Sequence, residues 1–313
     1  MTSARLRVGT RGSPLALAQA HQLRDRLMAA HDTLRAPDAI EIRVIKTTGD
    51  KVQDRPLTEI GGKGLFTKEI EEALIDRQID LAVHSMKDVE THLPHGLVIS
   101  TMLEREDPRD ALIARDGTSL ASLPEGTVVG SASLRRKAQI LMHRPDLSVV
   151  NLRGNVGTRL QKLADGKIDA TLLALAGLKR LGMAEHATAL LTTEEMLPAP
   201  GQGAIGIEIR SNDDETRRWL APLDHRSTHI AVTAERSLLA ELDGSCRTPI
   251  AALAEIKNDR LALRALIALP DGSEYHREAI EGPAAQAAEL GRKAGQALRA
   301  KAGPAFFARL QGA

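Results

Sequence analysis

The chain has 313 residues, of which 42% are hydrophobic, so it can bury a sizeable core and is expected to form two or three domains. Lysine and arginine total 42 against 41 aspartate and glutamate residues, and aromatic residues make up 2%, which argues against a nucleic-acid-binding protein. A single cysteine excludes an internal disulfide.

Short β-branched runs alternate with amphipathic stretches over the first two-thirds of the chain, which predicts an α/β fold with a largely parallel sheet. The helix after the first strand is the clearest element. Apolar residues recur at i, i+4, i+7 and i+11 from Ala16, Ser13 stands at the N-cap, and Pro14 occupies the first helical position. The runs expected to form strands are residues 6–8, 42–45, 80–83, 127–129 and 148–150.

Two irregular segments interrupt this alternation. Residues 103–110 are charged and contain a proline, and residues 197–203 combine two prolines with two glycines. They predict two crossings between two lobes, joined by a double hinge. We expect the first lobe to comprise residues 1–103 with 204–221, and the second lobe residues 109–199.

The pattern changes in the last third of the chain. A helix expected over residues 230–242 is followed by three strand-like runs with turns at 257–259 and 271–272, and then by an alanine-rich helix from about residue 284. This order predicts a small α+β C-terminal domain, residues 226–313, with a three-stranded antiparallel sheet.

Residues 201–206 match the G-x-G-x-x-G motif of dinucleotide-binding sites, but their context does not fit. That motif needs a strand before it and a helix after it, whereas two prolines precede this one and the strand-like residues 205–209 follow it. We therefore expect a loop followed by a strand. The glycine run at residues 61–64 also fails as a phosphate-binding loop, and predicts a mobile loop instead.

Three predicted strand-to-helix turns combine arginine with hydroxyl or amide side chains, at residues 10–13, 131–136 and 153–159. Ligands of open α/β sheets bind beyond the carboxyl ends of strands, where helix N-termini offer free N–H groups. Because guanidinium groups match carboxylates in bidentate geometry, this set favours a ligand with several carboxylates over a single phosphate. Lys63 and Arg180 are weaker candidates for the same cluster.

Asp88 and Cys246 are the candidate reactive residues. Asp88 follows a predicted strand, at the same sheet edge as the arginines, and as an ionised acid it suits stabilisation of positive charge or proton transfer. Its structural alternatives are a salt bridge to Lys87 or a helix N-cap. Cys246 lies in a polar turn, residues 243–249, which favours an exposed nucleophile or covalent anchor over a buried core residue.

Eight segments, in order and over nearly the whole chain, resemble the porphobilinogen deaminase family, also called hydroxymethylbilane synthases. They are RGSPLAL (11–17), GKGLF (62–66), VHSMKDV (83–89), SLRR (133–136), RGNV (153–156), AGLKRLG (176–182), PGQG (200–203) and the turn around Cys246. The resemblance implies two lobes like those of the bacterial periplasmic binding proteins, and a third domain that holds the cysteine.

The resemblance also implies a reaction and a cofactor. The expected enzyme is a transferase of haem biosynthesis that condenses porphobilinogen units head to tail, with loss of ammonia, into the linear tetrapyrrole hydroxymethylbilane. The implied cofactor is dipyrromethane, joined to Cys246 by a thioether. The enzyme is expected to be a monomer.

Roles for individual residues follow from the same resemblance. Asp88 would be the catalytic carboxylate that stabilises the azafulvenium-like cation left when ammonia departs. The residues implied in cofactor binding besides Cys246 are Ser13, Lys87, Ser133, Arg135, Arg136 and Arg153. Those implied in substrate binding are Arg11, Arg159, Arg180, Lys63, Phe66 and Gln202, with Lys63 and Phe66 on a mobile loop and Gln202 at the hinge. At position 90 this chain has glutamate where the family commonly has proline. We expect this difference to leave the backbone after Asp88 less restrained.

Two other functions are considered. A non-catalytic two-lobed binding protein for a small polycarboxylate would use the same arginines, but the third domain with Cys246 argues against it. The N-terminus also argues against it, because it lacks an export signal. Since the sequence has no membrane-spanning stretch either, we expect a cytoplasmic protein that binds no membrane. A hydrolase with Cys246 as nucleophile would need a basic partner, and neither His84 nor His225 has a spacing that argues for it. No metal-ligand spacing occurs among the histidines, so no metal is expected.

Overall fold

The computed structural model describes residues 6–51, 64–116, 119–244 and 248–311. The chain divides into two compact units, Met1–Arg105 with Ala204–His229 and Glu106–Gly203 with Ile230–Ala313. The division into three domains, with its boundaries, stays a prediction.

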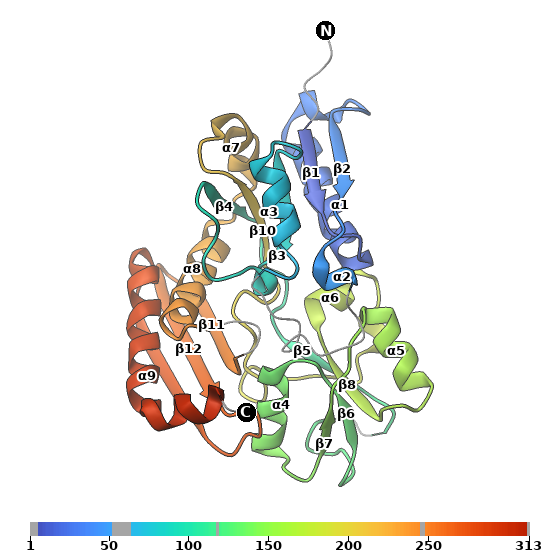
Figure 1. Ribbon diagram of the computed structural model, residues 1–313, viewed down its shortest axis with the longest axis vertical. Coiled ribbons are helices and arrows are strands. Elements are labelled where there is room, and N and C mark those ends of the chain that lie inside the picture. The colour runs from blue at the N-terminus through green and yellow to red at the C-terminus, as the bar shows by residue number, and fades with distance from the viewer. Residues whose placement is uncertain (1–5, 52–63, 117–118, 245–247, 312–313) are drawn as a thin grey trace. The chain divides into compact units, whose positions relative to one another are not determined.

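The first unit is built on a five-stranded sheet in the order β2-β1-β3-β10-β4 (Figure 1). β1 pairs parallel with β2 and β3, whereas β10 pairs antiparallel with β3 and β4. The strands are β1 (Leu6–Thr10), β2 (Ile40–Val44), β3 (Leu81–Ser85), β4 (Leu97–Met102) and β10 (Ile205–Arg210). The helices are α1 (Pro14–Ala30), η1 (Asp32–Arg35), α2 (Thr48–Lys51), α3 (Lys68–Ile75), η2 (Met86–Asp88), α7 (Asp214–Leu220) and η4 (Ala221–Leu223).

Helix α1 begins where the sequence predicts. The Ser13 hydroxyl accepts a hydrogen bond from the Ala16 N–H at 3.3 Å, and Pro14 occupies the first turn. The predicted apolar stripe packs on one face of the sheet, and α3 packs on the other. Alternation along β3 places Leu81 in the core under α1 and Ala82 in the core under α3. The buried stripe of α1 is Ala16, Ala20, Leu23 and Leu27.

The second unit contains a sheet of the same layout, in the order β7-β6-β8-β5-β9. β6 pairs parallel with β7 and β8, and β5 pairs antiparallel with β8 and β9. The elements are β5 (Asp110–Ala114), β6 (Val128–Gly130), α4 (Leu134–His143), β7 (Ser148–Val150), α5 (Val156–Ala164), β8 (Ala170–Ala174), α6 (Leu175–Arg180), η3 (Ala184–His186) and β9 (Ala189–Leu190). The antiparallel strand of each sheet, β10 or β5, forms directly after one of the two irregular segments.

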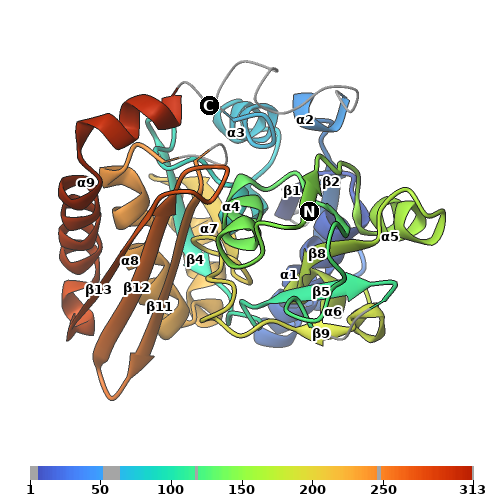
Figure 2. The same cartoon turned by 90° about the horizontal axis from the view of Figure 1, so that it is seen from below.

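A third, antiparallel sheet in the second unit has the order β11-β12-β13, as predicted. The predicted turn residues Asn258 and Asp259 have φ of 50° and 56°, and Gly272 has φ of 73°. α9 lies along one face of this sheet (Figure 2), and α4 packs on the other through Ala138. The elements are α8 (Arg226–Glu241), β11 (Ile250–Lys257), β12 (Arg260–Ala268), β13 (Tyr275–Pro283), η5 (Ala284–Gln286) and α9 (Ala287–Gln311).

These observations confirm the α/β fold class with an added antiparallel sheet. The prediction of a largely parallel sheet is wrong, because each five-stranded sheet has two parallel and two antiparallel pairings. The observations also confirm that residues 201–206 form a loop and a strand, because β10 begins at Ile205. In the described part of the chain, no helix combines the length and the apolar composition that a membrane crossing requires.

Candidate active site

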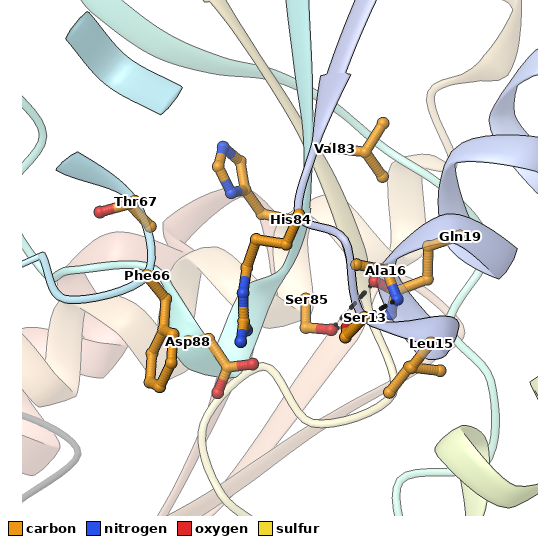
Figure 3. A pocket seen from close by; sticks show the side chains of 11 residues that line it. Ser13, Leu15, Ala16, Gln19, Phe66, Thr67, Val83, His84, Ser85 and Asp88 are labelled. Atoms are coloured by element: carbon orange, nitrogen blue, oxygen red, sulfur yellow. Dashed lines mark hydrogen bonds between the residues drawn. The ribbon is translucent and has the colours of Figure 1, made fainter. Parts of the chain in front are cut away.

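A small pocket of about 60 Å³ lies in the first unit, where β1 and β3 end (Figure 3). The turn from β1 into α1 contributes Arg11 and Ser13, and the end of β3 with η2 contributes Ser85 and Asp88. Because β1 and β3 are parallel neighbours, their carboxyl ends meet at one edge of the sheet. Phe66, just before α3, completes this part of the wall.

The Asp88 carboxylate is half-buried and lines this pocket, as does Ser85 (Figure 3). Among the residues that the structure describes, none donates a hydrogen bond to it. Ser85 is fixed by Gln19, whose Nε2 donates to the Ser85 hydroxyl at 2.8 Å. The turn is therefore held in place while its carboxylate can accept a hydrogen bond from a ligand N–H group.

Arg11 and Phe66 lie against each other in the same pocket. The Arg11 guanidinium carbon is 4.1 Å from the centroid of the Phe66 ring, a cation–π distance. The segment with Phe66 is tied to the region after Asp88, because the Gly64 N–H donates to the Glu90 carboxylate at 2.8 Å. The Glu90 side chain therefore contributes a contact in this region, and the expectation that the backbone after Asp88 is less restrained stays a prediction.

In the second unit, Arg135 and Arg136 form a buried ion cluster with Asp110. The arginines are each 5% exposed and Asp110 is 0% exposed, and the ion pairs measure 2.8 Å and 2.6 Å. Burial alone would raise the pKa of Asp110, but the two guanidinium charges outweigh it and lower that pKa to about 2. The charged segment 103–110, predicted to cross between the lobes, thus ends in Asp110, whose carboxylate is fully buried.

This cluster holds two guanidinium groups against one carboxylate, a formal charge of 2 − 1 = +1. Arg135 also donates to the Leu197 carbonyl oxygen, but its Nε atom is buried with no hydrogen-bond partner among the described residues. Gln202 is 1% exposed and donates to Asp110 at 3.1 Å and to the Pro108 carbonyl oxygen at 2.6 Å. The amide therefore links the two irregular segments.

The remaining predicted binding residues of the second unit lie in the turns and helices that follow β6, β7 and β8. Ser133 caps α4, accepting from the Arg136 N–H at 3.4 Å. Arg153 precedes α5, and Arg159 on α5 donates to the Gly154 carbonyl oxygen at 2.9 Å. Arg180 ends α6 and donates to the Gly203 carbonyl oxygen at 2.7 Å. Because β6 is parallel to β7 and β8, these turns share one edge of the sheet.

The structure thus brings Arg11, Ser13, Phe66 and Asp88 together in the first unit, with Lys87 half-buried next to Asp88. In the second unit, Ser133, Arg135, Arg136, Arg153 and Arg159 lie in the turns or first helical turns that follow β6 and β7, at one edge of the sheet, whereas Arg180 stands at the far end of α6, six residues after β8. Lys63 and Cys246 lie outside the described residues. Within the described residues, no group of three or more His, Cys, Asp or Glu side chains could hold a metal ion.

Sequence reasoning missed three polar residues around the pocket. Gln19 interrupts the apolar stripe of α1, which is a signal that a buried polar contact exists. Glu208 stands inside the apolar strand β10, and its carboxylate lies 2.9 Å from Nε2 of His84. Glu71 is buried on α3, where a helical pattern with several acids gave no indication that one of them faces the core.

Two family models match this chain. Residues 6–218 match "Porphobilinogen deaminase, dipyromethane cofactor binding domain", and residues 229–300 match "Porphobilinogen deaminase, C-terminal domain". The chain is similar to a solved methionine-binding lipoprotein described as putative, from Bacillus subtilis, with a TM-score of 0.43 and 12% identity over 70% of this chain and 89% of that one.

Two curated relatives extend over almost the full length. A chloroplastic porphobilinogen deaminase of Oryza sativa subsp. japonica is 58% identical over 309 residues, which is 98% of this chain and 86% of the relative. A porphobilinogen deaminase of Paracoccus denitrificans is 57% identical over 302 residues, 96% of each chain. The chain therefore belongs to the porphobilinogen deaminase family.

Proposed function

We propose that this chain is a transferase that condenses porphobilinogen units head to tail, with release of ammonia, into hydroxymethylbilane, using a covalently bound dipyrromethane. The observation that carries the proposal is the Asp88 carboxylate, which lies in a pocket next to Arg11 in a chain that matches the family over residues 6–218 and 229–300. A carboxylate beside cations suits a substrate that is acidic at its edges and becomes positively charged at its reacting carbon.

The residues of the second unit fit a cofactor with several carboxylates. The buried ion cluster has an excess positive charge, and the unpartnered Nε of Arg135 is a donor that an anionic group could satisfy. We assign cofactor binding to Ser13, Lys87, Ser133, Arg135, Arg136 and Arg153, with Cys246 as the thioether anchor. When bound, dipyrromethane supplies the pyrrole carbon to which the first substrate unit is joined.

Substrate carboxylates are assigned to Arg11, Arg159, Arg180 and Lys63, with Phe66 lining the pocket beside Arg11. Gln202 is assigned an indirect role. Since its side chain is buried and donates to Asp110, it acts by holding the ion cluster.

Asp88 is assigned the chemistry at the reacting carbon. Departure of ammonia breaks a carbon–nitrogen bond and leaves positive charge on the substrate pyrrole. The Asp88 carboxylate accepts a hydrogen bond from the pyrrole N–H and stabilises that charge. Joining the substrate carbon to the acceptor pyrrole would displace a proton there, and Asp88, the carboxylate that lines the pocket, would accept it.

We infer that the enzyme acts in the cytoplasm as a monomer and binds no nucleic acid or membrane. The net charge of +1 over 313 residues supports only the point about nucleic acid, because the chain has no general excess of basic residues for an anionic polymer.

The intact mass of the purified protein, with an assay for ammonia released from porphobilinogen, tests the proposal. We expect a mass that exceeds the bare chain by one dipyrromethane, and a Cys246→Ser variant without that excess. Iodoacetamide should leave the wild-type sulfur unlabelled. An unmodified mass in active wild-type protein would contradict covalent anchoring, and the absence of ammonia release would contradict the reaction.

A further inference from the structure

One hydrogen bond joins the segment that carries Asp88 to the segment that carries Phe66. The Gly64 N–H donates to Oε1 of Glu90 at 2.8 Å. Glu90 lies two residues after Asp88, and Gly64 lies two residues before Phe66. Asp88 and Phe66 both line the candidate pocket (Figure 3). The proposed chemistry gives Glu90 no role, yet its side chain connects two parts of the pocket wall.

The backbone at Gly64 requires an acceptor of this kind. Gly64 is buried and has a left-handed conformation, with φ of 71°. Its carbonyl oxygen accepts from the N–H groups of Thr67 and Lys68, at 3.0 Å and 2.9 Å, where α3 begins. A buried N–H without a partner is costly, because water no longer solvates it. The Glu90 carboxylate satisfies this N–H with a charged acceptor, which makes the stronger kind of hydrogen bond.

The position of the Phe66 ring depends on this stretch of backbone. The Gly49 N–H donates to the Leu65 carbonyl oxygen at 2.7 Å, and a Cβ added at Gly49 would overlap the Phe66 ring. The Arg11 guanidinium carbon lies 4.1 Å from the centroid of the same ring. The ring is therefore packed against both α2 and Arg11, and a shift of the backbone at Gly64 would move the ring and the guanidinium together.

The turn that ends in Asp88 has a restraint of its own. Met86, the first residue of η2, is 2% exposed, and its N–H donates to the Ala204 carbonyl oxygen at 3.0 Å. Loss of the Glu90 contact should therefore release residues 64–66 and leave Asp88 in place.

We propose that Glu90 is a positioning residue of this site, which holds the Gly64 peptide and thereby sets where Phe66 and Arg11 stand relative to Asp88. Glu90 does not need to touch the substrate. The inference rests on the proposed function in one respect, since an effect on substrate binding follows only if Arg11 binds a substrate carboxylate. In that case Glu90 acts on the affinity for the substrate and not on the chemistry assigned to Asp88.

Hydrogen exchange of the holoenzyme tests the restraint without turnover. In Glu90→Ala we expect the amides of residues 64–70 to exchange about tenfold faster or more, and those of α4 to stay unchanged. Glu90→Gln keeps a neutral acceptor, so its increase should be several-fold smaller. Glu72→Ala is the matched control, because Glu72 lies on α3 and its side chain is 58% exposed. Exchange in Glu90→Ala that equals the exchange in this control would overturn the proposal.

Steady-state release of ammonia from porphobilinogen tests the effect on the site. In Glu90→Ala we expect KM to rise about fivefold or more while kcat stays within about twofold of the wild type, because binding is lost and Asp88 is not displaced. Glu90→Gln should restore most of the loss, and Glu72→Ala should match the wild type. An unchanged KM in Glu90→Ala, or a loss confined to kcat, would contradict the positioning role.

Two further outcomes are decided by the same measurements. If Glu90→Ala does not fold, Glu90→Gln takes its place, and exchange and KM both equal to those of the wild type would overturn the proposal. A wild type that releases no ammonia would contradict the proposed function instead. The exchange experiment would then still decide whether Glu90 holds the Gly64 peptide.

Discussion

Two aspartates of this chain show how the surroundings of a side chain set its role. Asp110 is fully buried, and its carboxylate is held by Arg135 and Arg136 at 2.8 Å and 2.6 Å. Asp88 is half-buried in a pocket, with no hydrogen bond donated to it by a described residue. The first carboxylate neutralises charge within the protein, whereas the second is available to a ligand. Replacing each should therefore have a different consequence.

Asp110→Asn should lower the free energy of unfolding by about 3–5 kcal/mol, because it leaves two buried guanidinium groups without their carboxylate. Urea unfolding at neutral pH measures this change. Asp214→Asn is a suitable control, since the Asp214 side chain is 86% exposed and its loss should change stability by less than about 0.5 kcal/mol. A loss of less than about 1 kcal/mol in Asp110→Asn would contradict the cluster's structural role.

The same cluster predicts a pH dependence. Arg135 and Arg136 lower the pKa of Asp110 from 3.8 to about 2 in the folded state. A carboxylate with a lowered pKa stabilises the fold above its unfolded pKa, and that contribution is lost as the pH falls through the folded value. The stability difference between wild type and Asp110→Asn should therefore shrink by roughly 2 kcal/mol between about pH 4 and pH 2. Urea titrations at stepped pH would reveal a constant difference if this account is wrong.

Asp88→Asn tests the other carboxylate. The amide keeps the size of the side chain but removes its negative charge, so kcat should fall by about 100-fold or more. Intact mass should show that the covalent cofactor is still present, because we assign attachment to Cys246 and not to Asp88. Turnover at the wild-type rate in this variant would remove Asp88 from the mechanism.

At the scale of elements, the sequence predicted the features that depend on interactions between residues close together in the chain. The cap at Ser13, the stripe of α1 and the turns at Asn258 and Gly272 depend on a few adjacent residues, and all were predicted. The antiparallel placement of β10 between β3 and β4 was not, because strand direction depends on how the chain returns after a long excursion. For the same reason the sequence indicated that arginines gather at sheet edges but not that Asp110 is buried between two of them.

Gly206→Ala tests how β10 supports the turn that ends in Asp88. A methyl group at Gly206 would overlap Sδ of Met86, the buried first residue of η2. We expect a destabilisation of about 1–3 kcal/mol from overpacking and a lower kcat, because Met86 must move and the turn moves with it. The double variant Gly206→Ala with Met86→Ala makes room for the methyl group. Its loss should be smaller than the sum of the single losses, and strictly additive losses in urea unfolding would argue against the contact.

At the scale of the whole molecule, the binding of acidic ligands does not require a large positive net charge on the protein. The chain has a net charge of +1, yet its second unit buries a cluster of the same formal charge beside Ser133 at the start of α4. Charge in a buried site interacts more strongly than charge on a surface, because fewer water molecules screen it. A few guanidinium groups can thus select a carboxylate-rich molecule without making the protein a general anion binder.

In the second unit, α4 packs against both sheets, with Ile140 in the core of the β7-β6-β8-β5-β9 sheet and Ala138 in a separate cluster with the β11-β12-β13 sheet. Ala138 of α4 and Leu197 pack with Leu253 and Leu266 of the β11-β12-β13 sheet. The turn at Gly272 fits closely on α4, since an added Cβ would lie 2.7 Å from the Met142 nitrogen and 2.8 Å from the Ala138 oxygen. Both contacts are to backbone atoms, so they cannot be relieved by a change of rotamer.

Gly272→Ala should therefore weaken both sheets of the second unit together. Gly126→Ala is the matched control, because Gly126 has nearly the same backbone, with φ of 76° against 73°, and nothing within 4 Å of an added Cβ. Both variants incur about 1–2 kcal/mol for a left-handed alanine, but Gly272→Ala adds about 1–3 kcal/mol from the clash with α4. Hydrogen exchange should become faster in α4 and β12 of Gly272→Ala, and remain unchanged in β1 and β3. Equal stability losses in the two variants, or faster exchange in β12 alone, would show that α4 and the third sheet unfold independently.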